Sequence, residues 1–123
     1  MKSWSEAQLR RAAAGDRAYV EFLREESMSG GLYVLAAGAT DSQSPHTEDE
    51  LYVILSGRAR FTAGGETRVA APGDLIFVPA NLPHRFHDIT EDLSVAVVFA
   101  PPEYSAGPAG TRRYPSGHGR TQS

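Results

Sequence analysis

Cysteine is absent from this chain of 123 residues. Neither a disulfide nor a thiolate metal site is therefore possible. The sequence also lacks an apolar run long enough to span a bilayer, and its first residues show no signal-like apolar region. These absences predict a cytoplasmic protein that has no membrane partner.

Basic residues are in the minority, with 12 Lys and Arg against 15 Asp and Glu. Residues 1–100 carry nine of these basic side chains and fourteen of the acidic ones. Because nucleic-acid binding needs a basic face, this acidic body argues against nucleic acid as a partner. Residues 101–123 carry three Arg against Glu103 alone. An interaction module that uses this basic tail is the weakest alternative function.

Length and composition fit one globular domain with three parts. Residues 1–16 are predicted to be a helical segment, because Ser5 can cap a helix with Gln8 three residues later and a Gly-Asp pair can end it. Residues 17–100 form the body of the domain. Residues 101–123 contain four Pro and four Gly, and we expect them to be a flexible tail.

After the helical segment, short apolar runs rich in Val, Ile, Phe and Tyr alternate with Gly, Pro and Asp. About eight such runs predict an all-β sandwich or barrel. Gly64-Gly65 is a two-residue hairpin signal, and the segments 72–74 and 79–83 are typical of turns. The expected strands are residues 18–24, 31–37, 51–56, 58–63, 66–71, 75–78, 84–89 and 93–100.

Two of these runs, residues 51–55 and 95–99, are apolar on both faces. A strand in a sheet with one face in water should instead alternate apolar and polar residues. We expect these strands to be covered on both sides, by the opposite sheet and then by the N-terminal segment or a second subunit. A homodimer is the preferred explanation, since one short helix covers little area.

Two histidines and one carboxylate, His46, Glu50 and His84, are the candidate metal ligands. On a straight strand His46 and Glu50 share a face but lie about 13 Å apart, at roughly 3.3 Å per residue. Ligand atoms lie about 2.0–2.2 Å from their ion, so the chain must bend between these two residues. The polar segment 47–49 suits such a bend, which means that counting along the strand does not place the side chain of Glu48.

The spacing of these residues resembles the two motifs of the cupin superfamily. His46, Glu50 and Gly57 match the second half of the first motif, G-x5-H-x-H-x3/4-E-x6-G. The second motif, G-x5-P-x-G-x2-H-x3-N, is matched by Gly73, Pro79, His84 and Asp88, with Asn81 where Gly is usual. The resemblance covers about residues 30–100. It implies an all-β, single-domain jelly-roll β-barrel over residues 17–100 with a metal inside, and commonly a dimer.

One departure from the family pattern matters for the metal. The family's first histidine falls at Ser44, which is a poor ligand, so water, substrate, Gln43 or Glu48 could fill its position. The remaining two histidines and one glutamate have the composition of the 2-His-1-carboxylate triad of non-heme Fe(II) enzymes. With neutral imidazoles, Glu50 and a divalent ion sum to +1, which suits an anionic substrate or bound hydroxide.

Simpler interpretations of these residues stay open. His46 could belong to a solvated turn and His84 could cap a strand, which would leave a vestigial, empty site. His87 is three residues from His84, so on a strand it points to the opposite face. Asp88 shares the face of His84 and could orient its imidazole, or form a surface salt bridge. His118 lies in the tail and is expected to be inert.

Other side chains are candidates for the wall of the site. Tyr52 and Ile54 follow Glu50 at period two, and Phe86 follows His84, although all three serve first as core residues. Phe77 could close the wall. Arg58 and Arg60 share one face of their strand and either clamp a carboxylate or form a solvated edge.

Two functions from different classes follow. The first is a metal-dependent enzyme for a small organic substrate, either an oxygenase or an isomerase, lyase or cyclase, with Glu50 anchoring charge and Tyr52 or Glu48 transferring protons. The ion could be Fe, Mn, Ni, Cu or Zn. The alternative is a non-catalytic small-molecule binder or sensor with a degenerate metal site, for which Ser44 is the best support.

Overall fold

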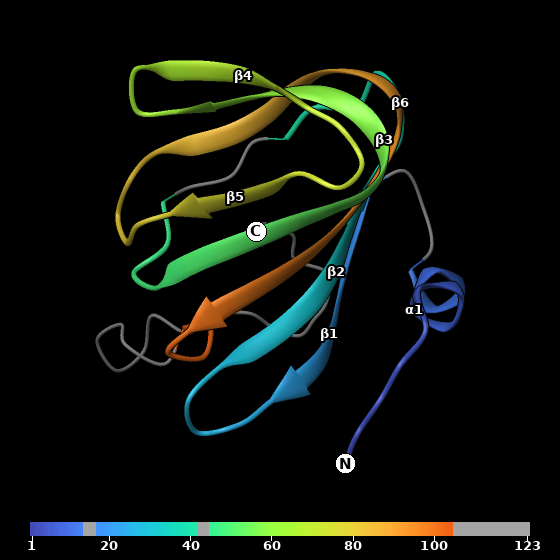
Figure 1. Cartoon of the computed structure of the whole chain (residues 1–123), viewed down its shortest axis with the longest axis vertical. Coiled ribbons are helices and arrows are strands. Elements are labelled where there is room, and N and C mark those ends of the chain that lie inside the picture. The colour runs from blue at the N-terminus through green and yellow to red at the C-terminus, as the bar shows by residue number, and fades with distance from the viewer. Residues whose placement is uncertain (14–16, 42–44, 105–123) are drawn as a thin grey trace.

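The structure, a computed structural model, describes residues 1–13, 17–41 and 45–104. It confirms the prediction of an all-β fold with a short N-terminal helix (Figure 1). The elements in chain order are α1 (Glu6–Ala12), β1 (Arg17–Arg24), β2 (Ser29–Leu35), β3 (Asp49–Ala63), β4 (Glu66–Ala70), β5 (Leu75–Val78) and β6 (His84–Ala100).

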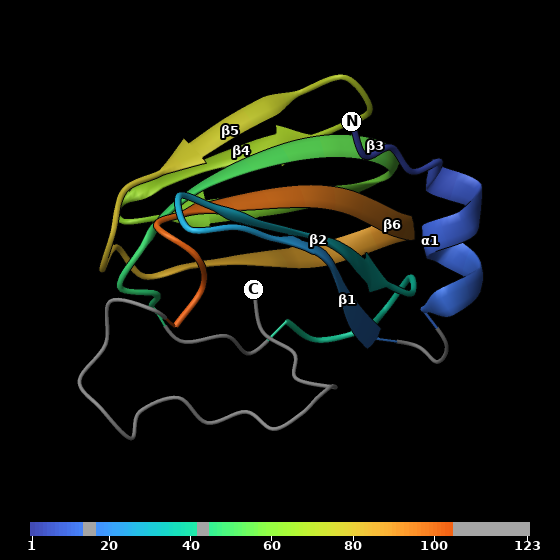
Figure 2. The same ribbon diagram turned by 90° about the horizontal axis from the view of Figure 1, so that it is seen from below.

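The strands form one antiparallel sheet in the order β1-β2-β6-β3-β4, and β5 pairs with β3. The long strands β3 and β6 pair from Asp49 opposite Ala100 to Ala63 opposite His84. The first part of β3 also pairs with β5, and its last part pairs with β4. Figures 1 and 2 show both long strands curving, so that the sheet wraps around an interior.

Four of the eight predicted runs join into the two long strands β3 and β6. Gly57 lies at an irregularity of β3, where the register with β6 shifts between Ser56 and Arg58, and such irregularities bend a strand. Gly57 has φ 94°, and a Cβ there would collide with the backbone of Asp92 and Leu93 in β6. Only glycine allows this backbone and this close approach. Residues 51–56 and 58–63, predicted as separate strands, therefore belong to one continuous strand that bends at Gly57.

Local signals at two other places behave as predicted. Ser5 and Gln8 form both bonds of a capping box at the start of α1. Gly64 and Gly65 connect β3 to β4 as a two-residue hairpin, with φ 60° at Gly64. The Gly-Asp pair expected to end the helix lies outside the described residues. None of the helices that the structure describes is long and apolar enough to cross a membrane.

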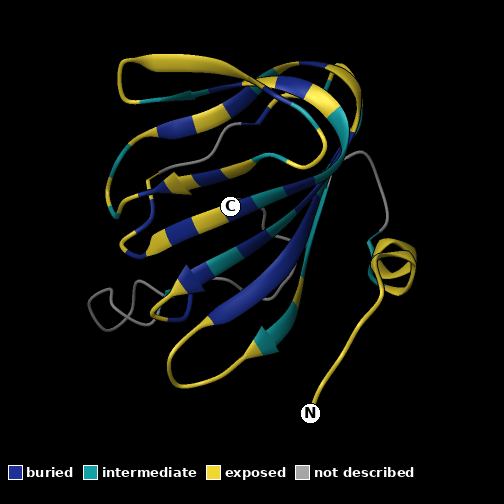
Figure 3. Ribbon diagram, in the orientation of Figure 1, coloured by how far each residue is buried: buried dark blue, intermediate teal, exposed yellow. Residues whose placement is uncertain are grey.

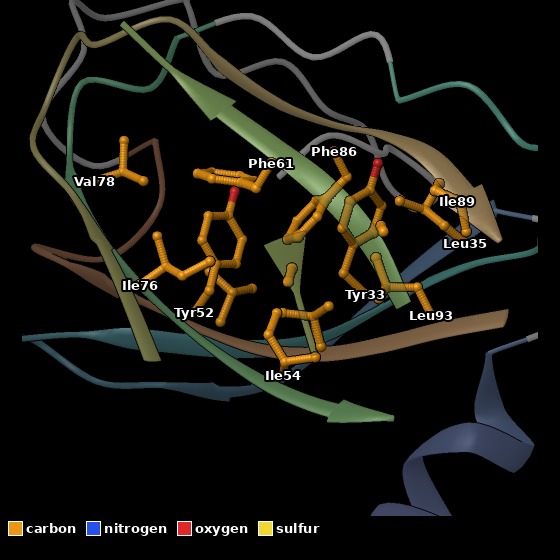
Figure 4. Packing of buried hydrophobic residues seen from close by; sticks show 14 of the residues in the cluster. Tyr33, Leu35, Tyr52, Ile54, Phe61, Ile76, Val78, Phe86, Ile89 and Leu93 are labelled. Atoms are coloured by element: carbon orange, nitrogen blue, oxygen red, sulfur yellow. The ribbon is translucent and has the colours of Figure 1, made fainter. Parts of the chain in front are cut away.

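Buried and exposed residues alternate along β5 and along most of β3, whereas nearly all of β2 is buried (Figure 3). The buried hydrophobic side chains form a core inside the barrel. The aromatic residues Tyr52, Phe61 and Phe86 meet there, with ring centroids 4.7 to 5.5 Å apart (Figure 4). Contacts of this kind fix ring positions more tightly than apolar burial alone does. Tyr52 and Phe61 of this cluster also lie beside the ring of His84.

The outer face of β3 and β5 also carries apolar side chains. Leu51, Leu75 and Phe77 are 40%, 64% and 61% exposed. The sheet register sets Leu51 opposite Phe77, and Val53 opposite Leu75, so these side chains lie on adjacent strands. Phe77 thus points out of the barrel and does not close its wall, because β5 alternates with Ile76 and Val78 inward.

Candidate metal centre

Three segments converge to build the site. Residues 47 and 48 bend the chain just before β3, and His46 and Glu50 lie on either side of this bend. Glu50 pairs with Val78 at the end of β5, and the turn at residues 79–82 leads from there back to His84 at the start of β6. The backbone N–H of Asn81 donates to the carbonyl of His46 over 2.6 Å, which ties this turn to the bend.

Asn81 replaces the glycine of the family pattern at a position that needs a left-handed backbone. Its φ is 68°. Asparagine tolerates this conformation better than most other residues do. The substitution therefore keeps the turn that places His84.

His46, Glu50 and His84 come together in the barrel, where their candidate ligand atoms lie within 4.8 Å of one another. Oε2 of Glu50 lies 3.0 Å from Nδ1 of His46 and 3.0 Å from Nε2 of His84. Two atoms that each lie about 2.1 Å from one ion are at most about 4.2 Å apart, so both contacts fit a shared ion. The three residues are only 5%, 2% and 6% exposed.

The ring nitrogens that face away from Glu50 indicate which nitrogen of each neutral imidazole carries the hydrogen. Nδ1 of His84 lies 2.7 Å from the carbonyl oxygen of Leu82, and Nε2 of His46 lies 3.1 Å from Oε2 of Glu103. A carbonyl or a carboxylate can only accept, so each of these nitrogens must carry the hydrogen. In neutral rings, the lone pairs of Nδ1 of His46 and Nε2 of His84 therefore point toward Glu50.

The converging atoms have no hydrogen bonds of their own. Nδ1 of His46 and Nε2 of His84 are buried and form none with any residue in the described part of the chain, and the same is true of Oε1, the Glu50 oxygen that does not face them. At 3.0 Å, both contacts with Oε2 of Glu50 are within ion-pair distance. Buried lone pairs at this separation repel one another unless a positive charge lies between them. Either protons or a cation can supply that charge.

The pKa shifts of these groups also favour positive charge beside Glu50. Burial lowers the pKa of His46, but the carboxylates of Glu103 and Glu50 outweigh burial and raise this pKa to about 9. Burial also opposes the charged form of His84, yet Glu50 and the Leu82 carbonyl raise its pKa. Burial raises the pKa of Glu50, whereas His46 and His84 lower it to about 2. The site thus favours an ionised Glu50 with positive charge beside it.

Aromatic rings lie beside both candidate histidine ligands. The ring of His84 lies 6.0 Å from those of Tyr52 and Phe61, and the ring of His46 lies 4.9 Å from that of Phe99. Tyr104, just after the last strand, stands 6.0 Å from His46. An apolar surround strengthens charge interactions at the centre, because it keeps water away from them.

The structure also brings in a carboxylate from outside the two sequence motifs. Glu103 belongs to residues 101–123, which are predicted to be a flexible tail, yet it is only 3% exposed and contacts His46. The structure describes residues 101–104 of this segment, and Pro102 and Glu103 are buried. One signal was available, since Glu103 is the single acidic residue in a stretch that is otherwise basic.

Glu48 lies beside the ligands without joining them. Its Oε2 accepts from the hydroxyl of Thr47 over 2.7 Å and from the backbone N–H of Tyr104 over 3.0 Å. Its Oε1 is buried and makes no hydrogen bond with the residues that the structure covers. Ser44 and Gln43, the other candidates for the position of the missing histidine, lie outside the described residues.

Asp88 does not orient His84. Its φ of 48° interrupts the alternation of β6 and turns the side chain outward, where Oδ2 lies 3.0 Å from Nδ1 of His87. His87 points away from the ligands as predicted, with Nε2 2.7 Å from the hydroxyl of Thr62. Arg58 and Arg60 are exposed on the outer face, and His118 lies outside the described residues.

Comparison with known proteins places this geometry in context. Residues 31–100, more than half of the chain, match the Cupin domain family. An uncharacterized protein of Streptomyces coelicolor is 58% identical over 91 residues, which cover 74% of this chain and 87% of that protein.

Solved structures share the fold. A Thermus thermophilus protein designated TT1209 is 27% identical, with a TM-score of 0.72 over 83% of this chain and 99% of that chain. A cupin family protein of Methanocaldococcus jannaschii with a double-stranded β-helix fold is 21% identical, with a TM-score of 0.64 over 72% of this chain and 83% of that one. The second likeness concerns the fold alone.

Proposed function

Because this chain belongs to the cupin domain family, we propose that its barrel holds a divalent metal ion on His46, Glu50 and His84 and acts there on a small organic molecule. The observation that carries the proposal is the convergence of two buried ring nitrogens, neither with a hydrogen bond among the described residues, on one carboxylate oxygen of Glu50. Imidazole and carboxylate ligands suit Fe, Mn, Ni, Cu and Zn.

A bound ion would supply Lewis acidity, which suits isomerase, lyase or cyclase chemistry. Bound iron would instead activate oxygen, which suits oxygenase chemistry. Glu50 anchors the positive charge. Glu48, with one buried carboxylate oxygen that makes no hydrogen bond among the described residues, is the proposed proton-transfer residue, and Tyr52 beside His84 is a second.

The charge balance bears on the substrate. The ion and Glu50 alone sum to +1, but ionised Glu103 beside His46 brings the sum to zero. Buried Glu48 adds a further acidic group to the surroundings. We therefore propose that the preference for an anionic substrate is weaker than the ligand set by itself implies.

A second candidate is a non-catalytic small-molecule binder or sensor in the same barrel. Its support is Ser44 at the position of the family's first histidine, which leaves the centre one imidazole short.

Elemental analysis of protein purified without chelators tests the proposal. We expect close to one equivalent of a first-row metal in the parent and a large loss in His46→Ala and His84→Ala. His87→Ala is the matched control, because this histidine bonds Thr62 and Asp88 outside the centre. Metal content that is unchanged in both site variants would refute the site, and a metal-free parent would favour the binder.

A further inference from the structure

We propose that Glu103 is a positioning residue that holds the imidazole of His46 in the orientation and tautomer that a metal requires. This inference rests on the proposed metal site and adds to it a carboxylate from outside the two sequence motifs. The structural basis is a contact of 3.1 Å between Oε2 of Glu103 and Nε2 of His46, with both side chains buried.

Hydrogen bonds to several parts of the barrel hold the backbone at Glu103, so the fold fixes the direction of its side chain. Its N–H donates to the hydroxyl of Ser29 on β2 over 2.9 Å. Its carbonyl accepts from Nη2 of Arg24 on β1 over 2.7 Å. The next residue, Tyr104, donates its backbone N–H to Glu48 in the bend before β3. Three separate parts of the barrel therefore fix this short segment against the centre.

The contact has a definite chemical consequence for His46. An ionised carboxylate accepts only, so Nε2 must carry the hydrogen, and in the neutral ring that binds a metal Nδ1 presents its lone pair toward Glu50. The carbonyl of Leu82 does the same for His84 through Nδ1. Outer acceptors of this kind fix ring orientation and make the ligating nitrogen more basic, and losing one typically weakens metal binding about 10–100-fold.

This orientation matters more here than in a site with three imidazoles. Ser44 occupies the position of the family's first histidine, so two rings and one carboxylate carry the ion. Without Glu103, the ring of His46 could turn or take the other tautomer, and its Nδ1 would then bear a hydrogen that opposes metal binding. Glu103 excludes that state.

Zn²⁺ titration of the parent, Glu103→Gln and Glu103→Ala tests the inference. Glutamine keeps the shape but can donate as well as accept, so it no longer enforces one tautomer. We expect both variants to bind Zn²⁺ about 10–100-fold more weakly than the parent. Glu91→Gln on the outer part of β6 is the matched control and should bind as the parent does. If Glu103→Ala does not fold, the isosteric Glu103→Gln variant carries the test.

Nitrogen-15 spectra of the Zn²⁺-loaded protein report which nitrogen of His46 carries the hydrogen. A merely structural role of Glu103 would leave this property unchanged. In the parent, His46 should bind the metal through Nδ1 and keep its hydrogen on Nε2, whereas in Glu103→Gln part of the His46 population should be free of metal, with its hydrogen on Nδ1 or shared between the two nitrogens. If the parent binds Zn²⁺ through His46 but both Glu103 variants keep its affinity and tautomer, this inference alone is overturned. If the parent and His46→Ala bind Zn²⁺ equally, the proposed metal site fails and this inference fails with it.

Discussion

Oε2 of Glu50 and Nε2 of His84 lie 3.0 Å apart in the barrel, although the two residues belong to different strands far apart in the sequence. The other nitrogen of His84 is committed to the Leu82 carbonyl. The atom that faces Glu50 therefore bears a lone pair in the neutral ring, and the contact is favourable only with a positive charge present.

The Glu50→Gln substitution should abolish most metal binding, because it removes the negative charge shared by His46 and His84 while keeping the side-chain shape. We expect the affinity for Zn²⁺ to fall at least about 10-fold, as measured by calorimetric titration. Glu66→Gln on the exposed part of β4 is the matched control. Equal affinity in parent and Glu50→Gln would mean that this carboxylate is no ligand.

The stability of the metal-free protein should peak in mildly acidic solution. The pKa of His46 is raised from 6.5 to about 9, so its contribution is complete below pH 6.5 and is lost as the pH rises through about 9. The pKa of Glu50 is lowered from 4.5 to about 2, so its contribution is present above pH 4.5 and is lost as the pH falls toward 2. These two groups together give the greatest stability between pH 4.5 and 6.5.

Urea unfolding in the presence of a chelator, at several pH values from about 3 to about 10, measures this profile. His46→Ala should flatten the loss of stability on the alkaline side, whereas His87→Ala should leave it in place. A free energy of unfolding that keeps rising through pH 9 in the parent would contradict the assigned direction for His46.

Gly57→Ala should destabilise the barrel by at least about 2 kcal/mol, or prevent folding. The reason is the left-handed backbone at Gly57 and the collision of a Cβ with the backbone of Asp92. Gly65→Ala is the matched control, since nothing lies within 4 Å of a Cβ there. The measurement is the free energy of unfolding in urea, and similar values for the two variants would show that the bend does not depend on glycine.

The homodimer stays a prediction, and the outer face of β3 and β5 is the surface that a second copy would cover. Phe77 and Leu75 are more than half exposed there. Phe77→Glu should therefore convert a dimer to a monomer in sedimentation analysis, while Val69→Glu on β4 should not. A parent that sediments as a monomer at all concentrations would contradict the dimer.

Short-range signals predicted the parts of the fold and site that depend on local chemistry. The capping box at Ser5, the Gly64 turn and the motif spacing of His46, Glu50 and His84 each follow from residue type and separation. The same spacing indicated that the chain bends between His46 and Glu50.

Features that depend on tertiary packing could not be predicted from short-range signals. Glu103 reaches His46 only because β6 ends beside the bend before β3, and no spacing rule links the two residues. Asp88 leaves the expected face because one left-handed residue reverses the alternation of the strand. Phe77 faces outward because its neighbours Ile76 and Val78 fill the interior.

Anomalous X-ray scattering from crystals of the metal-loaded protein tests the central claim most directly. The account predicts one peak in the barrel interior, in contact with Nδ1 of His46, a carboxylate oxygen of Glu50 and Nε2 of His84. A peak elsewhere in the protein would contradict it. A fully metal-loaded protein in which the side chains of His46, Glu50 and His84 point away from one another would also contradict it.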